Sequence, residues 1–346
     1  MNIAGRPIGR DAQPFVIAEM SGNHNRSLDQ ALAIVDAAAK AGAHAVKLQT
    51  YTADTITLDC RSEKFFIKDA RSPWHGERLY DLYLKAHTPW DWHPPIMQRA
   101  HDQGLICFSS VFDETSVDFL ESLSTPAYKI ASFENTHHPL IRKAAATGKP
   151  LIMSTGMASI AELDEAVAVA RAAGCKDLVL LKCTSSYPAS PSHSNIRTIR
   201  HMQEMFACEV GLSDHTLGVG VAAAAVACGA TVFEKHLTLC RADGGVDSAF
   251  SMEPHEFASL VTETTNAWEA LGNVHYGATQ AEVGSLAFRR SLFIATDLPA
   301  GERLTESAIR VVRPAHGLHP RHLPQFLGRE LRRNVAKGEP LDWGMI

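Results

Sequence analysis

Eight short apolar runs, separated by longer segments of helical period, constrain the fold of this 346-residue chain more than any other feature. Their apolar residues are continuous rather than alternating, which is typical of strands buried on both faces of a parallel sheet. Glycines such as Gly42, Gly104 and Gly174 stand where the intervening helices should end. The runs are residues 15–18, 45–48, 105–108, 127–130, 151–153, 178–181, 209–212 and 230–233. Eight strand–helix units over about 270 residues predict an α/β fold, a (β/α)8 TIM barrel.

The regular period breaks in two places. Residues 52–88 form a long insertion, rich in charged and aromatic side chains, which would project from the active-site face of such a barrel. Beyond Leu271 the helical pattern ends, and short strands with glycine turns predict a small β-rich domain. We therefore expect a barrel domain over residues 1–270, a polar linker over 271–290 and the small domain over 291–346.

Composition and charge exclude several classes of protein. Hydrophobic residues make up 45% of the chain and the net charge is −5, so a large core can form and a generally basic nucleic-acid binder is not indicated. No apolar run approaches the ~20 residues of a membrane span, and residues 1–10 lack the apolar core of a secretory signal. Seven cysteines, mostly in apolar contexts and without a CxxC pair, indicate reduced core thiols. We expect a cytoplasmic protein that binds neither nucleic acid nor membrane.

Polar side chains gather where the predicted strands end, which is where barrels of this class carry their chemistry. Serines at these points could be helix N-caps, or they could be donors to a phosphate. His215 and His236 lie one strand–helix unit apart, so they should face one mouth, although each could also be a core histidine. Two imidazoles with open positions suit a divalent ion such as Mn²⁺. The candidates at the strand ends are Glu19, Lys47, Gln49, Ser110, Lys129, Ser132, Glu134, Ser154, Ser185, Tyr187, His215, Glu234 and His236, with Asp247 nearby.

This pattern indicates a phosphorylated, anionic substrate beside a polyhydroxy one. Two lysines and several hydroxyls could bind the phosphate, while acidic groups could bind sugar hydroxyls or support the metal. The pattern alone leaves three enzymes open, namely a phosphoenolpyruvate-condensing enzyme, a metal-dependent aldolase and a phosphosugar isomerase.

Seven motifs together resemble the sialic acid synthase family. They are IAE at 17–19, NHN at 23–25, AVKLQT at 45–50, YKIAS at 128–132, STGM at 154–157, GLSDHT at 211–216 and EKH at 234–236. The segment from Ser291 onward resembles the C-terminal antifreeze-like (SAF) domain of the same family. The resemblance therefore covers nearly the whole chain and implies a catalytic TIM barrel followed by a SAF domain.

The family condenses phosphoenolpyruvate with an open-chain acetamido sugar to give a nine-carbon 2-keto acid and phosphate, so the resemblance implies a carbon–carbon-bond-forming transferase. It implies that a divalent metal, expected to be Mn²⁺ with Mg²⁺ or Co²⁺ as alternatives, binds His215 and His236. The implied phosphoenolpyruvate-binding residues are Lys47, Ser110, Lys129, Ser132, Ser154 and Ser185. The implied sugar-binding residues are Glu19, Gln49, Tyr187, Glu234, Asp247 and Arg313. The implied catalytic residues are Glu19, Lys47, Lys129, Glu134, His215 and His236.

Three further motifs, at residues 52–59, 247–251 and 313–320, resemble a branch of the family whose acceptor is a 2,4-diacetamido-2,4,6-trideoxy sugar. The alternatives are a branch that uses another acetamido sugar, a metal-dependent aldolase, and a carbohydrate-binding protein without activity. The resemblance also implies a domain-swapped homodimer, in which Arg313 reaches the active site of the other subunit.

Overall fold

The computed structural model describes residues 1–70 and 72–346. The chain divides into two compact units, Met1–Gly272 and Asn273–Ile346, and each is described by itself. Within the described residues, no helix combines the length and the apolar character that a membrane span requires.

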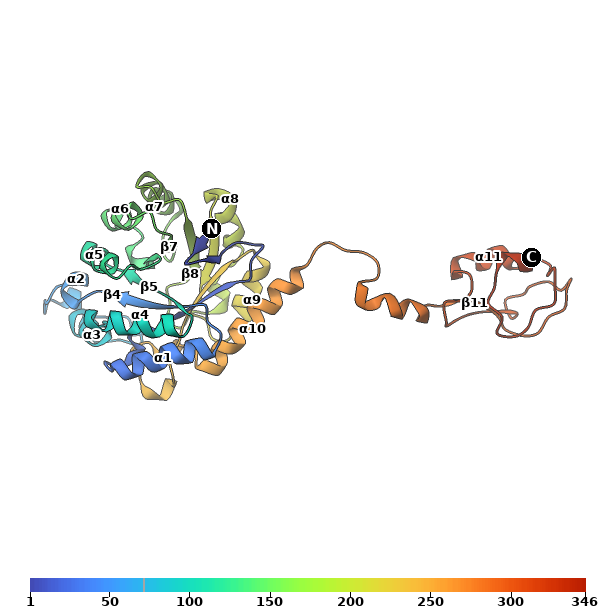
Figure 1. Cartoon of the computed structure of the whole chain (residues 1–346), viewed down its shortest axis with the longest axis horizontal. Coiled ribbons are helices and arrows are strands. Elements are labelled where there is room, and N and C mark those ends of the chain that lie inside the picture. Colours follow the sequence, from blue (N-terminus) through green and yellow to red (C-terminus); the bar gives the residue numbers. More distant parts are fainter. Residues whose placement is uncertain (71) are drawn as a thin grey trace. The chain divides into compact units, whose positions relative to one another are not determined.

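The first unit is built around a closed barrel of eight parallel strands, in the order β10-β3-β4-β5-β6-β7-β8-β9 (Figure 1). The strands are β3 (Phe15–Glu19), β4 (Ala45–Thr50), β5 (Ile106–Val111), β6 (Tyr128–Ile130), β7 (Leu151–Ser154), β8 (Leu178–Cys183), β9 (Glu209–Ser213) and β10 (Val232–His236). The barrel closes where β10 pairs with β3, with His236 opposite Glu19. The (β/α)8 prediction is confirmed.

Helices connect the strands and surround the barrel (Figure 1). They are α1 (Leu28–Lys40), α2 (Ala53–Ile56), α3 (Leu79–Ala86), α4 (His93–Asp102), α5 (Glu114–Ser122), α6 (His138–Ala146), α7 (Ile160–Ala172), α8 (Thr198–Phe206), α9 (Gly220–Ala227) and α10 (Pro254–Leu271). Side chains form caps at several helix starts. Ser27 accepts a hydrogen bond from the Gln30 amide, and Ser159 forms a capping box with Glu162.

Short 3-10 helices occupy many of the loops. They are η1 (Ser21–His24), η2 (Glu63–Phe65), η3 (Trp90–Trp92), η4 (Ser132–Glu134), η5 (Pro191–His193), η6 (Arg241–Asp243), η7 (Ser248–Phe250), η8 (Gln280–Phe288), η9 (Pro320–His322) and η10 (Trp343–Met345). Three of them, η1, η4 and η7, directly follow or lie near the C-terminal ends of β3, β6 and β10, and they position side chains at the mouth of the barrel.

Alternate residues of each strand point into the barrel, and this inward row changes character along the strand. Phe15 and Ile17 of β3 belong to the apolar cluster inside the barrel, and the next inward residue of this strand is Glu19. The same change occurs on β4, from Ala45 to Lys47 and Gln49. The strands therefore fill one end of the barrel with hydrocarbon and place charged groups at the other end.

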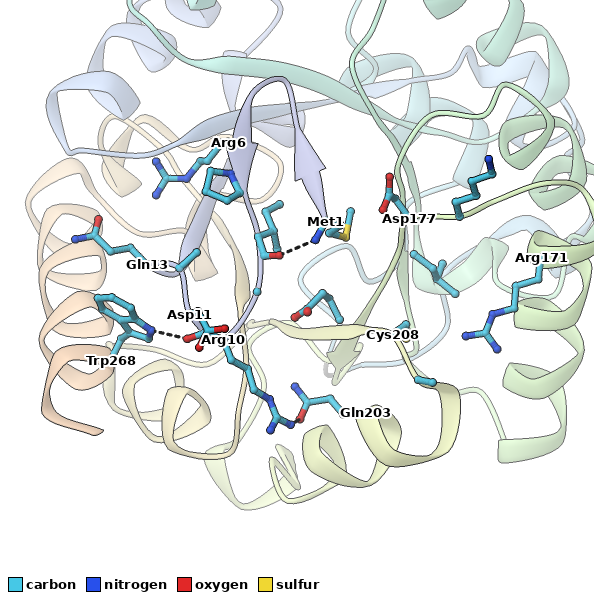
Figure 2. A pocket seen from close by; sticks show the side chains of 18 residues that line it. Met1, Arg6, Arg10, Asp11, Gln13, Arg171, Asp177, Gln203, Cys208 and Trp268 are labelled. Carbon is cyan, nitrogen blue, oxygen red and sulfur yellow. Dashed lines mark hydrogen bonds between the residues drawn. The ribbon is translucent and has the colours of Figure 1, made fainter. Parts of the chain in front are cut away.

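The N-terminal hairpin closes the apolar end. Its strands are β1 (Asn2–Ile3) and β2 (Arg6–Pro7), and Ile3 and Ile8 are buried in the apolar cluster inside the barrel. A cavity of about 1120 Å³ lies between this hairpin and the starts of β8 and β9 (Figure 2). Two cations that line it have partners, because Arg10 donates to Gln203 Oε1 and Arg171 donates to the Phe206 carbonyl.

The second unit contains an antiparallel pair, β11 (Ser291–Ile294) and β12 (Ile309–Val312), and a short α-helix, α11 (Leu323–Phe326), besides the 3-10 helices η8, η9 and η10. Its own core includes Leu292, Leu304 and Phe326. In its described residues, further β pairing consists of isolated bridges, because turns interrupt the chain every few residues. Residues 273–290 precede this core and contain η8, a short helix where the sequence predicts only a polar linker.

Candidate active site

Four ionisable side chains from four strands meet inside the charged end of the barrel. Lys47 Nζ contacts Glu19 Oε2 and lies 3.8 Å from Glu234 Oε1. Lys129 Nζ lies 3.8 Å from Glu234 Oε2. Lys47 also donates a 2.8 Å hydrogen bond to Ser110 Oγ. All five side chains are buried, so the predicted phosphoenolpyruvate lysines and two of the predicted sugar carboxylates share one desolvated cluster.

Burial and neighbouring charges shift the pKa values of the two carboxyl groups of this cluster in opposite directions. Burial raises the pKa of Glu19 to about 7, although Lys47 opposes this shift. Burial acts on Glu234 too, but Lys129 and Lys47 outweigh it and hold the pKa of Glu234 below its usual range. Near neutral pH, Glu19 is therefore partly protonated. Burial lowers the pKa of Lys129, whereas Glu19 and Glu234 raise that of Lys47, so Lys47 is the more firmly charged of the two lysines. Such a cluster is suited to an anionic ligand.

Several buried polar atoms at this end have no partner within the described residues. They include Ser154 Oγ, Glu134 Oε2 and His236 Nδ1. Leaving a buried donor or acceptor unpaired costs about 1–3 kcal/mol, so a group of them at one end of the barrel indicates polar atoms that bind a ligand. Burial raises the pKa of Glu134 to about 7, so this side chain can hold or release a proton near neutral pH.

The two predicted metal ligands face each other. The rings of His215 and His236 are buried, with their centroids 5.4 Å apart. His215 Nδ1 lies 3.1 Å from the Thr184 carbonyl, which orients the ring. Burial holds the pKa of His236 well below its usual range, so its imidazole is neutral, as metal ligation requires.

The fit to a metal depends on ligands from outside the chain. Among the described residues, no group of three or more His, Cys, Asp or Glu side chains forms a ready-made metal site. The two imidazoles, with the unpaired Nδ1 of His236, fit a divalent ion whose other positions are filled by substrate and water. They do not fit a closed structural zinc site.

A buried ion pair supports the loop that carries His215. Lys235 Nζ lies 2.7 Å from Asp214 Oδ2, and the other oxygen of Asp214 accepts hydrogen bonds from the amide and hydroxyl of Thr216. Both residues lie in motifs that the sequence offered, but no role was predicted for them, since a lysine near a strand end is usually solvated or in a salt bridge.

The predicted sugar-binding side chains form a chain of hydrogen bonds. Gln49 Nε2 donates to Glu19 Oε1 at 2.9 Å and to Ser21 Oγ at 3.0 Å. Ser21 in turn donates to Asp247 Oδ2, and burial raises the pKa of Asp247. Ser21, which sequence reasoning missed, therefore links Gln49 to Asp247 across the mouth.

The predicted phosphate-binding serines lie around Gly156. Ser132 Oγ accepts a 3.1 Å hydrogen bond from the Gly156 amide. A Cβ at this position would clash with the hydroxyl oxygens of Ser185 and Ser132, so only glycine allows both hydroxyls to lie this close to the backbone. The structure therefore brings Ser132 and Ser185 together, while Ser154 lies at the end of the neighbouring strand with an unpaired hydroxyl.

One expectation is revised by the structure, and one stays untested. Cys183, predicted as a core thiol, is buried, but its Sγ lies at the mouth, 3.7 Å from Ser185 Oγ and 3.9 Å from His215 Nδ1. Cys183 ends β8, and that position was the signal that could have identified it. Arg313 follows β12 in the second unit, so its predicted contact with a sugar stays a prediction.

Comparisons with known proteins identify the family of this chain. The model of the NeuB family matches residues 34–276, and that of the SAF domain matches residues 289–346. The chain belongs to the NeuB family, and the predicted membership of the sialic acid synthase family is confirmed.

Its relatives include synthases of several nonulosonic acids. The chain is 40% identical to a pseudaminic acid synthase of Campylobacter jejuni over 334 residues, covering 96% of this chain and 97% of the relative. It is 39% identical to the pseudaminic acid synthase of Helicobacter pylori, covering 95% and 96%. An N,N'-diacetyllegionaminic acid synthase of Legionella pneumophila is 34% identical, covering 99% and 97%.

Solved structures show the same architecture. The N-acetylneuraminic acid synthetase of Leptospira borgpetersenii matches with a TM-score of 0.73 at 29% identity, covering 83% of this chain and 94% of that one. A spore coat polysaccharide biosynthesis protein of Bacillus subtilis matches with a TM-score of 0.67 at 31% identity, covering 100% and 98%.

Proposed function

We propose that this chain is a transferase that makes pseudaminic acid. It condenses phosphoenolpyruvate with 2,4-diacetamido-2,4,6-trideoxy-β-L-altropyranose and water, and it releases phosphate. The observation that carries the proposal is the buried cluster of Lys47, Lys129, Glu19 and Glu234 beside two facing imidazoles. The pseudaminic acid synthases of C. jejuni and H. pylori, at 40% and 39% identity over nearly the full chain, support this particular acceptor.

The donor binds to the two lysines and the serine hydroxyls. Phosphoenolpyruvate carries a phosphate and a carboxylate, and Lys47 and Lys129 are buried cations that could each bind one of these anionic groups. Ser110, Ser132, Ser154 and Ser185 add neutral donors. Fixed donors in a desolvated site stabilise developing charge more than water does, because they need no reorganisation during the reaction.

His215 and His236 hold the divalent metal, expected to be Mn²⁺ with Mg²⁺ or Co²⁺ as alternatives. When bound, such an ion polarises the carbonyl of the acceptor as a Lewis acid. Asp247, whose carboxylate lies 3.9 Å from His236 Nδ1, stands beside that imidazole and accepts from a sugar hydroxyl.

The acceptor reacts as its open-chain aldehyde. C3 of phosphoenolpyruvate attacks the aldehyde carbon, water then adds to C2, and cleavage of the C–O bond releases phosphate. Gln49, Tyr187 and Asp247 bind and orient the sugar. The carboxyl groups of Glu19 and Glu134, with pKa values of about 7, exchange protons with water and with the new hydroxyl.

A second copy of the chain completes the site. Three apolar side chains on the loops after β6, β7 and β9 are exposed around the mouth, namely Phe133 (63%), Met157 (64%) and Leu217 (64%). Exposed apolar groups around a polar site are typical of a surface that a partner covers. The chain forms a homodimer in which the C-terminal unit of one subunit covers the other mouth and brings Arg313 to the sugar.

The protein acts in the cytoplasm. This placement is supported by its donor, a metabolite of the cytoplasm, and by its seven free cysteines.

A product assay tests the proposal. The protein is incubated with phosphoenolpyruvate, Mn²⁺ and a panel of acetamido sugars, and the products are identified by mass while phosphate is measured. We expect phosphate and a nine-carbon keto acid, with the 2,4-diacetamido-2,4,6-trideoxy sugar as the best acceptor. Equal or better efficiency with N-acetylmannosamine would place the chain among neuraminic acid synthases, and a product without phosphate release would indicate an aldolase.

A further inference from the structure

Three aromatic side chains from three separate segments form one side of the mouth. Trp74 comes from the insertion at 52–88, Tyr187 follows β8, and Phe250 ends η7. The ring centroid of Trp74 lies 5.7 Å from that of Tyr187 and 6.2 Å from that of Phe250, and Tyr187 and Phe250 are 5.1 Å apart. We call these three residues the aromatic wall.

The aromatic wall adjoins the two imidazoles. The ring of Tyr187 is 4.6 Å from that of His215, and the ring of Phe250 is 5.0 Å from that of His236. Trp74 is therefore linked to the metal-binding pair through two ring contacts, although its own segment is more than a hundred residues away in sequence. A sugar bound at the imidazoles would therefore lie close to the rings of Tyr187 and Phe250.

The wall offers hydrocarbon rather than hydrogen bonds. The side chain of Trp74 has one hydrogen-bond donor, the indole N–H, and this group already donates to the Val246 carbonyl at 2.9 Å. Phe250 has no polar side-chain atom. The remaining polar side-chain atom of the wall is the hydroxyl of Tyr187, which interacts with Ser185.

Phe250 is buried (2% exposed), so the half-buried rings of Trp74 and Tyr187 form the apolar surface, which contrasts with the charged remainder of the mouth. A sugar hydroxyl placed against it would lose water without gaining a partner, whereas a methyl group would gain apolar contact. We propose that the aromatic wall binds a methyl group of the acceptor sugar and that Trp74 is its specificity-determining residue. The inference rests on the proposed function, and the methyl is either that of the 6-deoxy carbon or that of an acetamido group.

Paired acceptors test the inference. The kcat/KM of the 2,4-diacetamido-2,4,6-trideoxy sugar is compared with that of its 6-hydroxy analogue and of its formamido analogues, at saturating phosphoenolpyruvate and Mn²⁺. We expect the wild type to prefer the methyl-bearing sugar over at least one analogue by about 10–100-fold, the usual range for one small group in an apolar pocket. In Trp74→Ala this ratio should fall toward one, while the KM for phosphoenolpyruvate stays unchanged.

Further variants keep the test decisive. Trp74→Phe should retain most of the ratio, and Trp74→Gln should raise the relative turnover of the analogue; both remain informative if Trp74→Ala does not fold. Trp90→Phe is the matched control for Trp74→Phe. Trp90 stacks on Phe119 at 4.6 Å and donates to the Tyr51 carbonyl, so its change should leave the ratio at the wild-type value.

The outcomes separate the inference from the function. If Trp74→Ala loses the preference for the 6-deoxy sugar over its 6-hydroxy analogue, the wall binds the 6-methyl group. If it loses the preference over the formamido analogues, the wall binds an acetamido methyl group. Wild-type ratios in folded Trp74→Ala or Trp74→Gln overturn the inference and leave the proposed function intact. A wild-type protein that turns over none of these sugars with phosphoenolpyruvate would instead overturn the function.

Discussion

Along β4 the inward side chains change from Ala45 near the base of the barrel to Lys47 and Gln49 at the mouth, and β10 changes from Val232 to Glu234 and His236. The base is closed by the chain's own N-terminal hairpin, whereas the mouth is ringed by exposed apolar side chains. The same strands thus do two different tasks. The base supplies apolar burial, and the mouth concentrates buried charge that a packed core would exclude. Changes at the two ends should therefore have separable effects on stability and on catalysis.

The largest expected effect concerns the imidazole pair. His236→Ala should lower kcat by about a thousandfold or more, because Lewis-acid stabilisation contributes several kcal/mol and each 1.4 kcal/mol is tenfold. EDTA should silence the wild type, and Mn²⁺ should restore it. Calorimetric titration with Mn²⁺ and a thermal unfolding curve should show lost metal binding in a folded protein.

The control is His101→Ala, since the side chain of His101 is 86% exposed. Full activity of the wild type after verified removal of metal would contradict this role for the imidazole pair.

The next effect concerns closure of the mouth by a second copy. Arg313→Ala and His236→Ala homodimers should each be nearly inactive. In a mixed dimer, a swapped arrangement places both lesions in one site and none in the other, so up to about half of the wild-type activity should return. Activity is measured on mixed dimers isolated with two affinity tags. No recovery in verified mixed dimers would reject the swapped arrangement and leave the barrel chemistry untouched.

At the base, the expected effect is on stability. Phe15 is fully buried in the apolar cluster inside the barrel, and Phe15→Ala should lower the free energy of unfolding by about 3–5 kcal/mol. The gentler Phe15→Leu should cost less. Denaturation followed by circular dichroism gives these values, and steady-state kinetics should show an unchanged KM for phosphoenolpyruvate in the folded variants. A large change in that KM would mean that the two ends are not separable.

Much of the barrel and of its charged mouth could be predicted from the sequence. Continuous apolar runs specify buried parallel strands, and a polar residue two positions after an inward apolar one stays on the same face. That rule identifies Glu19, Lys47 and Glu234 before any coordinates are known. The spacing of one strand–helix unit predicted that His215 and His236 face one mouth, and the motif resemblance implied their role as metal ligands.

Other parts depended on loop geometry, which leaves little periodic signal. Trp74 lies in the insertion, and its indole N–H donates to the Val246 carbonyl near the mouth. Ser21 donates to Asp247, which lies more than two hundred residues away in the sequence. Cys183 has the apolar context of a core thiol, yet it ends its strand at the mouth. In the second unit, the strands are too short and too irregular for alternation to show their limits.

The central claim, that the charged end of the barrel binds phosphoenolpyruvate, is tested most directly by measuring binding of that donor by calorimetry in the presence of Mn²⁺. Lys129→Met removes one buried cation from the mouth, and a charge-assisted contact contributes about 1.5–3 kcal/mol. Lys149→Met is the matched control, because Lys149 pairs with Glu121 outside the mouth. The account predicts that Lys129→Met binds the donor about 10–100-fold more weakly than the wild type, and that Lys149→Met binds it equally well. Wild-type affinity in a folded Lys129→Met variant would contradict the account.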